Sequence, residues 1–321
     1  MRAWFAASAT GDRGLFSPAA ELAGMLRLAV ANAAETFERI QGPLADRGVA
    51  VEHVPVSERT VDLTGTDGFA GVDADLDAFD AGFVYPGRMM EGGVADALLS
   101  VPWVNGRDAV LTSRNKAAVL AELARADVPV PESVLVSNPV DESALVDAYE
   151  RFAPPVVVKP NSTTRGIGVA KLHDADSFLG VTDYLDLVHD YRATGDKSFV
   201  VQEYLADATD YRVMVVDGEY VGAVERSLPA SERSRGHWKH NVHRGAEATG
   251  VDLAPEHRRL AERVASVLDV DFLGVDLLAT PDRAVVNETN ARPTVDAATK
   301  YEDDFYDRLA ALIERTARES P

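Results

Sequence analysis

The chain has 321 residues and a formal net charge of −20, with 46% hydrophobic and 26% charged residues. This composition is typical of a folded globular protein and not of a disordered one. The acidity argues against nucleic acid as a partner, because phosphate backbones bind clustered lysines and arginines. The absence of cysteine excludes disulfides and thiolate metal sites.

No apolar run reaches the roughly 20 residues that a membrane span needs, and the N-terminus does not have the pattern of a signal peptide. We therefore expect a cytoplasmic protein without a membrane partner. Only six of the basic residues are lysines, against many carboxylates. Such a surface holds water and stays dispersed in salt, so the composition suggests a halophilic origin.

The first third of the chain predicts an α/β domain over residues 25–107, preceded by an appendage over residues 1–24 that shows no clear period. A β–α–β opening is followed by a long acidic loop, another strand, a helix and a short strand. The predicted strands cover residues 26–31, 49–54, 81–85 and 102–105, and the predicted helices cover 35–47 and 94–100.

From residue 108 onward the elements no longer alternate regularly, which predicts an α+β region. We divide it into residues 108–200 and 201–321. The predicted helices cover residues 108–126, 142–152, 255–267 and 305–317. The predicted strands cover residues 133–136, 155–159, 199–204, 211–216, 220–225, 273–279 and 284–290.

The last predicted hairpin is the sharpest chemical feature. With a turn centred on Asp282, Asp276 faces Glu288 with Cβ atoms about 5 Å apart, and Asn290 projects from the same face. Facing carboxylates repel unless something positive lies between them. Three oxygen ligands without Cys or His suit Mg²⁺. The alternative is a polar outer face on which the acids pair by accident.

A second feature is a buried strand that ends at Lys159 and runs into a polar loop with Gly166 and Gly168. Glycines let backbone N–H groups close over phosphate oxygens, and the lysine supplies a point charge. The loop is neither a Walker A motif nor G-x-G-x-x-G. Taken alone, it could equally be a hairpin with a mobile tip.

Two further segments are polar where a nucleotide could bind. The strand ending at Glu203 and Tyr204 leads to Asp210, which could hold a ribose hydroxyl next to a purine. Residues 238–245 form a basic loop in an acidic protein. The alternatives are a core strand with a polar turn and a solvated surface loop. Zinc ligation by the loop's histidines is disfavoured because no third His or Cys follows at a suitable spacing.

In this order, these segments resemble the ATP-grasp superfamily, and within it the RimK-like group of ribosomal-protein glutamate ligases. The resemblance rests on residues 113–116, 159 with 166–169, 201–204, 210–212, 239–245, 274–276 and 287–291. It covers residues 26–316 and is specific from about residue 108. It implies an ATP-grasp fold, in which an N-terminal pre-ATP-grasp α/β domain precedes two α+β subdomains that enclose ATP.

The resemblance also implies ATP and two Mg²⁺ ions as cofactors, with Mn²⁺ as a substitute. Lys116 and Lys159 would contact the phosphates, and Arg212 and Arg244 would neutralise the transferring phosphoryl group. The implied nucleotide-binding residues are Lys116, Lys159, Gly166, Gly168, Glu203, Tyr204, Asp210, Lys239, His240 and Asn241. The implied metal ligands are Asp276, Glu288 and Asn290, and the implied catalytic residues are Lys159, Arg212 and Arg244.

The chain departs from the group after Asn290, where Arg292 replaces a serine that the glutamate ligases favour. Arg292 is a candidate to bind a substrate carboxylate or phosphate. The implied reaction activates a small-molecule or peptide carboxylate as an acyl phosphate and joins it to an amine, such as that of glutamate or another amino acid. Relatives are often homo-oligomers. The alternatives are ATP-dependent activation of a different acceptor and a regulatory module that binds nucleotide without turnover.

Overall fold

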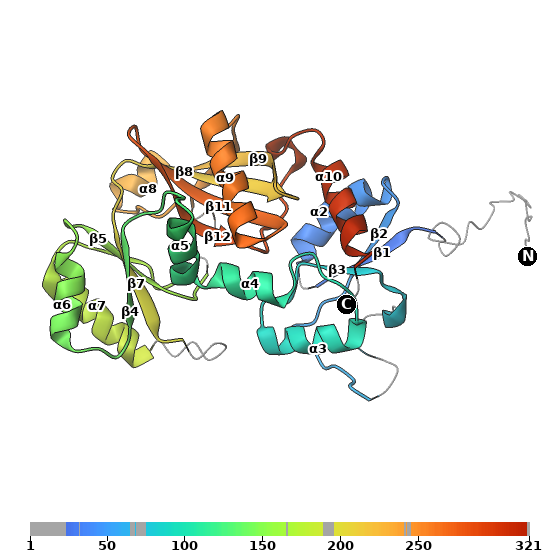
Figure 1. Ribbon diagram of the computed structural model, residues 1–321, viewed down its shortest axis with the longest axis horizontal. Coiled ribbons are helices and arrows are strands. Elements are labelled where there is room, and N and C mark those ends of the chain that lie inside the picture. The colour runs from blue at the N-terminus through green and yellow to red at the C-terminus, as the bar shows by residue number, and fades with distance from the viewer. Residues whose placement is uncertain are drawn as a thin grey trace, which may run out of the picture.

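The computed structural model describes residues 24–31, 33–64, 68, 75–164, 166–188, 196–240, 242 and 245–319. These residues form three sheets that follow one another along the chain (Figure 1). The predicted appendage lies outside the described residues except for Gly24. No helix in the described ranges has both the length and the apolar character that a bilayer crossing requires.

The N-terminal sheet is parallel, with the strand order β2-β1-β3. Its elements are β1 (Leu26–Val30), α2 (Ala34–Ala45), β2 (Val49–His53), η1 (Leu76–Ala78), β3 (Ala81–Phe83) and α3 (Met89–Leu99). The predicted β–α–β opening is therefore confirmed. The strand predicted at residues 102–105 is wrong, because only a single bridge joins Trp103 to Gly82 there.

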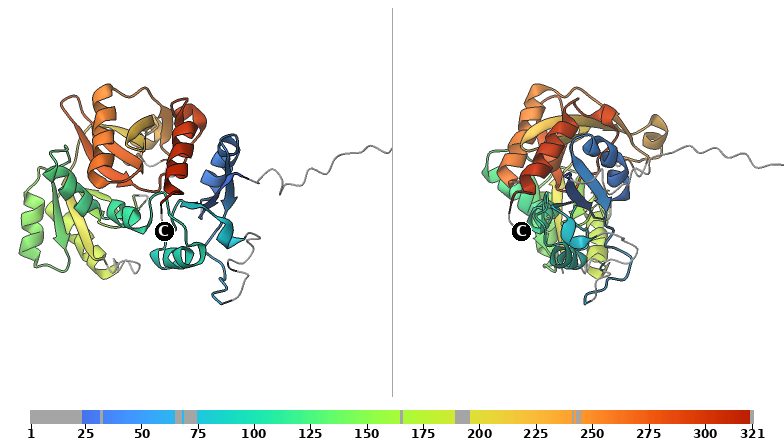
Figure 2. Two further views of the ribbon diagram at one scale, coloured as in Figure 1. Left: turned by 45° about the vertical axis from the view of Figure 1, so that its right-hand side comes forward. Right: turned by 90° about the vertical axis from the view of Figure 1, so that its right-hand side faces the viewer.

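The C-terminal helix returns to this N-terminal unit. Helix α10 (Phe305–Thr316) contacts α2, and in Figure 2 it stands between the N-terminal and the C-terminal sheets. One buried cluster joins Leu28 and Ile40 of the N-terminal unit to Phe272 and Leu309 of the C-terminal part. The N-terminal unit and the C-terminal part therefore share one apolar core.

The single helix predicted at residues 108–126 is wrong, because the structure has two helices there. Helix α4 (Arg107–Arg114) stops at Asn115, and α5 (Lys116–Arg125) begins immediately after it. Asn115 is not helical, and its side-chain oxygen accepts a hydrogen bond from the N–H of Ala118 at 3.1 Å. Asparagine is a preferred N-cap residue, so it starts a new helix inside a helix-forming stretch.

The second sheet is antiparallel, with the order β4-β7-β5-β6. It comprises β4 (Ser133–Ser137), β5 (Val156–Pro160), β6 (Ala170–Leu172) and β7 (Ser198–Glu203), with α6 (Glu142–Glu150) and α7 (Ala175–Val188) packed against it. Helix α7 was not predicted. The domain boundary that we placed at residue 200 falls inside β7.

The third sheet has the order β10-β9-β8-β11-β12. Its elements are β8 (Thr209–Val216), β9 (Glu219–Ser227), α8 (Ala230–Ser234), β10 (Glu247–Gly250), α9 (Pro255–Leu268), β11 (Phe272–Ala279) and β12 (Ala284–Asn290). Helix α5 contacts both β12 and α9, so the start of the α+β region lies against the C-terminal sheet. This packing brings Lys116, at the start of α5, next to the last hairpin.

Candidate active site

The last hairpin pairs the two acids as predicted: Asp276 lies opposite Glu288, and Gly274 lies opposite Asn290. The predicted turn centre at Asp282 is nevertheless wrong. A register shift follows Asp276, so that Leu277 pairs with Val286. The extra residue on β12 forms a bulge, which compensates for the displaced turn and keeps the acids opposite each other.

Two arginines neutralise Asp276, which is only 6% exposed. Arg212 on β8 binds both carboxylate oxygens, with Nη2 at 3.0 Å from Oδ2, and Arg226 on β9 lies 3.1 Å from the same oxygen. Burial raises the pKa of the Asp276 carboxyl, but the two guanidinium groups outweigh it and hold that pKa below its usual value.

Sequence reasoning missed Arg226, which also binds Asp210 through Nε at 3.0 Å. Strands β8 and β9 are joined at Asp217 and Gly218, and counting outward from the pair Val216–Glu219 would place Asp210 opposite Glu225. A register shift between Met214 and Val215 places Arg226 opposite Asp210 instead. The pairing therefore depends on an irregularity in the strands that cannot be counted from the sequence.

Two lysines reach the hairpin from other elements. Nζ of Lys116 lies 3.6 Å from Oε1 of Glu288. Nζ of Lys159, at the end of β5, donates to the backbone and side-chain oxygens of Asn287 at 3.3 and 3.2 Å. Lys159 is only 4% exposed, and burial lowers its pKa to about 8. Lysines from α5 and β5 therefore both contact the second strand of the hairpin.

The loop after Lys159 approaches the basic loop of the C-terminal half. Lys239 Nζ donates to the carbonyl oxygen of Gly166 at 3.4 Å. Gly166 and Gly168 both have positive φ, and a Cβ at Gly168 would lie 2.7 Å from Pro160 Cγ, so this turn favours glycine. Two predicted residues of the basic loop, Asn241 and Arg244, lie outside the described residues.

The side chains predicted to bind the nucleoside are held by protein partners. Glu203 accepts the N–H of Glu132 at 2.8 Å and pairs with Arg283 at 2.6 Å. The ring of Tyr204 meets Trp238 edge-on, with centroids 5.9 Å apart.

The ammonium of Lys171 lies 4.6 Å from the Tyr204 ring centroid. His240 Nδ1 lies 3.6 Å from Oδ2 of Asp210. The structure thus places His240 beside Asp210, which also pairs with Arg226.

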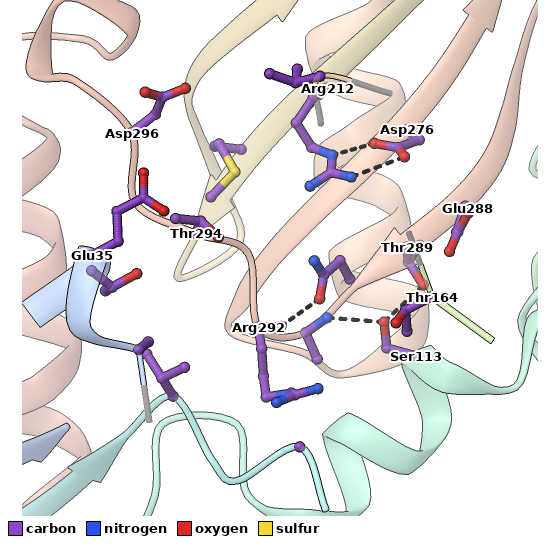
Figure 3. A pocket seen from close by; sticks show the side chains of 18 of the residues that line it. Glu35, Ser113, Thr164, Arg212, Asp276, Glu288, Thr289, Arg292, Thr294 and Asp296 are labelled. Atoms are coloured by element: carbon purple, nitrogen blue, oxygen red, sulfur yellow. Dashed lines mark hydrogen bonds and ion pairs between the residues drawn. The ribbon is translucent and has the colours of Figure 1, made fainter. Parts of the chain in front are cut away.

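A cavity of about 1090 Å³ opens between the hairpin and the N-terminal unit. Figure 3 shows Glu35 and Asp296 across this cavity from Asp276 and Glu288. The basic side chains that line it are Arg39, Arg88, Arg114, Lys116, Arg212, Arg226, Arg292 and Lys300, and the acidic ones are Glu35, Asp276, Glu288 and Asp296. Among the described residues of the lining, eight cationic side chains stand against four carboxylates, an excess of positive charge in a chain whose net charge is −20.

The three predicted metal ligands all line the cavity. They are two carboxylates and one amide. In the described part of the chain, no group of three or more His, Cys, Asp or Glu side chains could hold a metal ion. Asn290 Oδ1 already accepts the N–H of Arg292 at 2.9 Å. Hard oxygen donors that leave positions open for phosphates and water fit Mg²⁺.

Residues 113–313 match the model of a protein family described as the RimK-like ATP-grasp domain. It is 30% identical over 226 residues to a probable alpha-L-glutamate ligase 2 of Shewanella frigidimarina, covering 70% of this chain and 71% of that protein. It is 30% identical over 217 residues to a ribosomal protein bS6–L-glutamate ligase of Escherichia coli, covering 67% of this chain and 68% of that protein.

Among solved structures, the fold is similar to that of the ATP-grasp ligase PsnB complexed with a minimal precursor, Mg and ADP. The TM-score is 0.60 at 17% identity, and the match covers 91% of this chain and 98% of that one. Because it covers 91% of the chain, this likeness extends into the N-terminal unit, which precedes residues 113–313 matched by the family model. The chain belongs to the RimK-like ATP-grasp family and is a ligase that forms carbon–nitrogen bonds.

Proposed function

We propose that this protein uses ATP to activate a substrate carboxylate as an acyl phosphate and then joins it to the amine of an amino acid. The observation that carries the proposal is the facing pair Asp276 and Glu288. These carboxylates lie among cations from β5, α5, β8 and β9, beside a cavity whose described lining has more cationic side chains than carboxylates. Such an array fits a site where a metal–phosphate complex and an anionic substrate meet.

In this proposal Asp276, Glu288 and Asn290 hold two Mg²⁺ ions, and Lys116 and Lys159 bind the ATP phosphates. The solved structure of PsnB, which has a similar fold, holds Mg and ADP, and this supports the proposed cofactors. Bound Mg²⁺ would neutralise phosphate charge during transfer. The two lysines come from different elements but converge on one strand, which lets them bracket a phosphate chain.

The nucleoside end of ATP would lie beyond these lysines, near Tyr204 and Asp210. Lys239 and Gly166 would close over the phosphates, since they already touch across the two loops. Closure matters because an acyl phosphate is lost to water unless water is excluded.

The reaction has two balanced steps. A carboxylate oxygen forms a bond to the γ-phosphorus of ATP as the bond from that phosphorus to the β–γ bridging oxygen breaks and ADP leaves. The amine nitrogen then attacks the acyl carbon, phosphate leaves, and the nitrogen loses a proton. Arg212, which faces the hairpin from β8, would stabilise the charge on the transferred group, together with Arg244.

Glutamate is the first amino acid to test, because two related proteins are named as glutamate ligases. One of them is named for a ribosomal protein, so a protein or peptide carboxylate is a candidate acceptor besides small molecules. The eight cationic side chains of the cavity favour an acceptor or an amino acid that carries negative charge.

The test is an ADP-release assay with Mg²⁺ over amino acids and candidate carboxylates in high salt. We expect Lys159→Ala and Glu288→Gln to abolish amine-dependent ADP release while the circular dichroism spectrum stays unchanged. Lys197→Ala and Glu247→Gln are matched controls at exposed positions and should retain activity. Near-normal turnover by either site variant contradicts the proposal. Nucleotide binding by the wild type without turnover of any pair would favour a regulatory module.

A further inference from the structure

Two arginines, Arg114 and Arg292, lie near Gly87 on the side of the cavity that the N-terminal unit forms. Arg114, the last residue of α4, donates through Nη2 to the carbonyl oxygen of Gly87 at 2.9 Å. Arg292 donates through Nη1 to the carbonyl oxygen of Tyr85 at 3.2 Å. A Cβ built on Gly87 would lie 2.9 Å from the same Nη1. Two guanidinium groups therefore converge on one loop of the N-terminal unit, and both side chains line the cavity.

Arg114 is unusual among these cations because it is only 9% exposed. Its Nη1 is buried and has no hydrogen-bond partner in the described part of the chain, where the structure also shows no ion pair for it. An arginine cannot lose its proton, so it stays charged when buried. A buried charge without a counter-charge is costly, and so is a buried donor without an acceptor. A ligand that supplies both would remove both costs.

The position of Arg114 is fixed relative to the hairpin. The hydroxyl of the preceding Ser113 accepts the N–H of Ala291 at 2.9 Å and lies 3.2 Å from the hydroxyl of Thr289. These contacts hold the end of α4 against β12. A group bound by Arg114 would therefore have a defined distance from Glu288, the residue next to Thr289.

We infer that Arg114, together with Arg292, binds the non-reacting carboxylate of the amino acid whose amine is ligated. The inference rests on the proposed function, and it identifies the residues that select an amino acid over a simple amine. The phosphates of ATP have their own cations in Lys116 and Lys159. The anion left over in such a ligation is the amino acid's carboxylate, and a planar guanidinium matches its two oxygens.

The test measures binding and does not need turnover. The twenty proteinogenic amino acids are titrated calorimetrically into the wild-type protein, with and without Mg²⁺ and a non-hydrolysable ATP analogue. Each amino acid that binds is then compared with its α-amide, which lacks the negative charge. We expect the wild type to prefer the free acid by about 10- to 100-fold, the range for a buried charged hydrogen bond.

Arg114→Ala should reduce this preference at least about tenfold, and Arg114→Lys should restore part of it by returning the charge. The ratio of two affinities in one preparation does not depend on the fraction of folded protein, so partial misfolding cannot imitate the result. Arg107→Ala, at an exposed position on the same helix, is the control and should keep the wild-type ratio.

An unchanged acid-to-amide ratio in Arg114→Ala overturns the inference, and so does failure of the wild type to bind any amino acid. Competition by inorganic phosphate that is equal to that of the amino acid would also overturn it, since the site would then be a general anion site. An Arg114-dependent preference for the acid, found without any ADP release, would support this subsite while the proposed ligase function fails. The two conclusions can therefore be told apart.

Discussion

Raising the pH should weaken nucleotide binding through Lys159. Burial lowers the pKa of this lysine to about 8 in the free protein, whereas an exposed lysine titrates near 10.4. ATP phosphates beside the ammonium would favour its charged form. Above pH 8 the free protein therefore carries a neutral lysine that must take up a proton before phosphate can bind to it.

The magnitude follows from the charged fraction. With a pKa of about 8, roughly 90% of the free protein is charged at Lys159 at pH 7 and about 10% at pH 9. Because the apparent affinity scales with the competent fraction, the dissociation constant of an ATP analogue should rise about tenfold between these two pH values. Nucleotide phosphates, with a second pKa of about 6, are already ionised throughout this range.

Isothermal titration calorimetry in two buffers of different ionisation enthalpy measures both the affinity and the proton uptake. The uptake should approach one proton at pH 9. Lys159→Arg is the control, since a guanidinium stays charged and its profile should be flat. A wild-type affinity that is constant between pH 7 and 9, or an equal decline in Lys159→Arg, would refute the reasoning.

The same lysine affects the stability of the free protein. Its folded pKa lies below the unfolded value, so between about pH 8 and 10.4 the unfolded chain binds more protons than the folded one. Burial of the charged lysine therefore destabilises the folded protein fully below pH 8, and this destabilisation disappears as the pH rises from about 8 to about 10.4. Lys159→Met should raise the urea midpoint at pH 7 relative to the wild type, because it removes a buried charge.

Two substitutions test the neighbouring contacts. Gly87→Ala places a methyl group 2.9 Å from Arg292 Nη1, so we expect the KM for the amino acid to rise on the order of tenfold while the fold stays intact. Gly93→Ala is the control, because a methyl group there meets open space and should leave this KM unchanged. Ser113→Ala leaves the N–H of Ala291 without its acceptor, and the free energy of unfolding should fall by about 1–3 kcal/mol in a urea titration; an unchanged midpoint would show that α4 is held by other contacts.

The hairpin could be predicted from the sequence because its information is local. Strand alternation and a short turn were enough to place Asp276 opposite Glu288, although the pairs between these acids and the turn are shifted by one residue from the predicted register. The error was harmless only because a bulge restored the pairing. A one-residue slip without that bulge would have moved the acids to opposite faces of the strands.

The missed features depend on contacts between distant segments or on competition between local signals. The break at Asn115 was hidden by strong helix formers on both sides, and the cap outweighed them. The role of Arg114 could not be read from the sequence, because Gly87, which it contacts, lies 27 residues away on another unit. Arg226 lies between these cases, since its partner Asp210 is local but its second partner, Asp276, is not.

Under the proposed function, the charges around the hairpin explain how the free protein tolerates two facing carboxylates. Asp276 is neutralised by Arg212 and Arg226, and Glu288 by Lys116. If these acids bind Mg²⁺ when ATP enters, the arginine and lysine side chains that they release can pair with the phosphates. Each charged group then exchanges one partner for another, and none is left unpaired. Loss of Arg212 should then weaken both states: the free protein would lose a partner for a buried carboxylate, and the complex would lose a partner for phosphate.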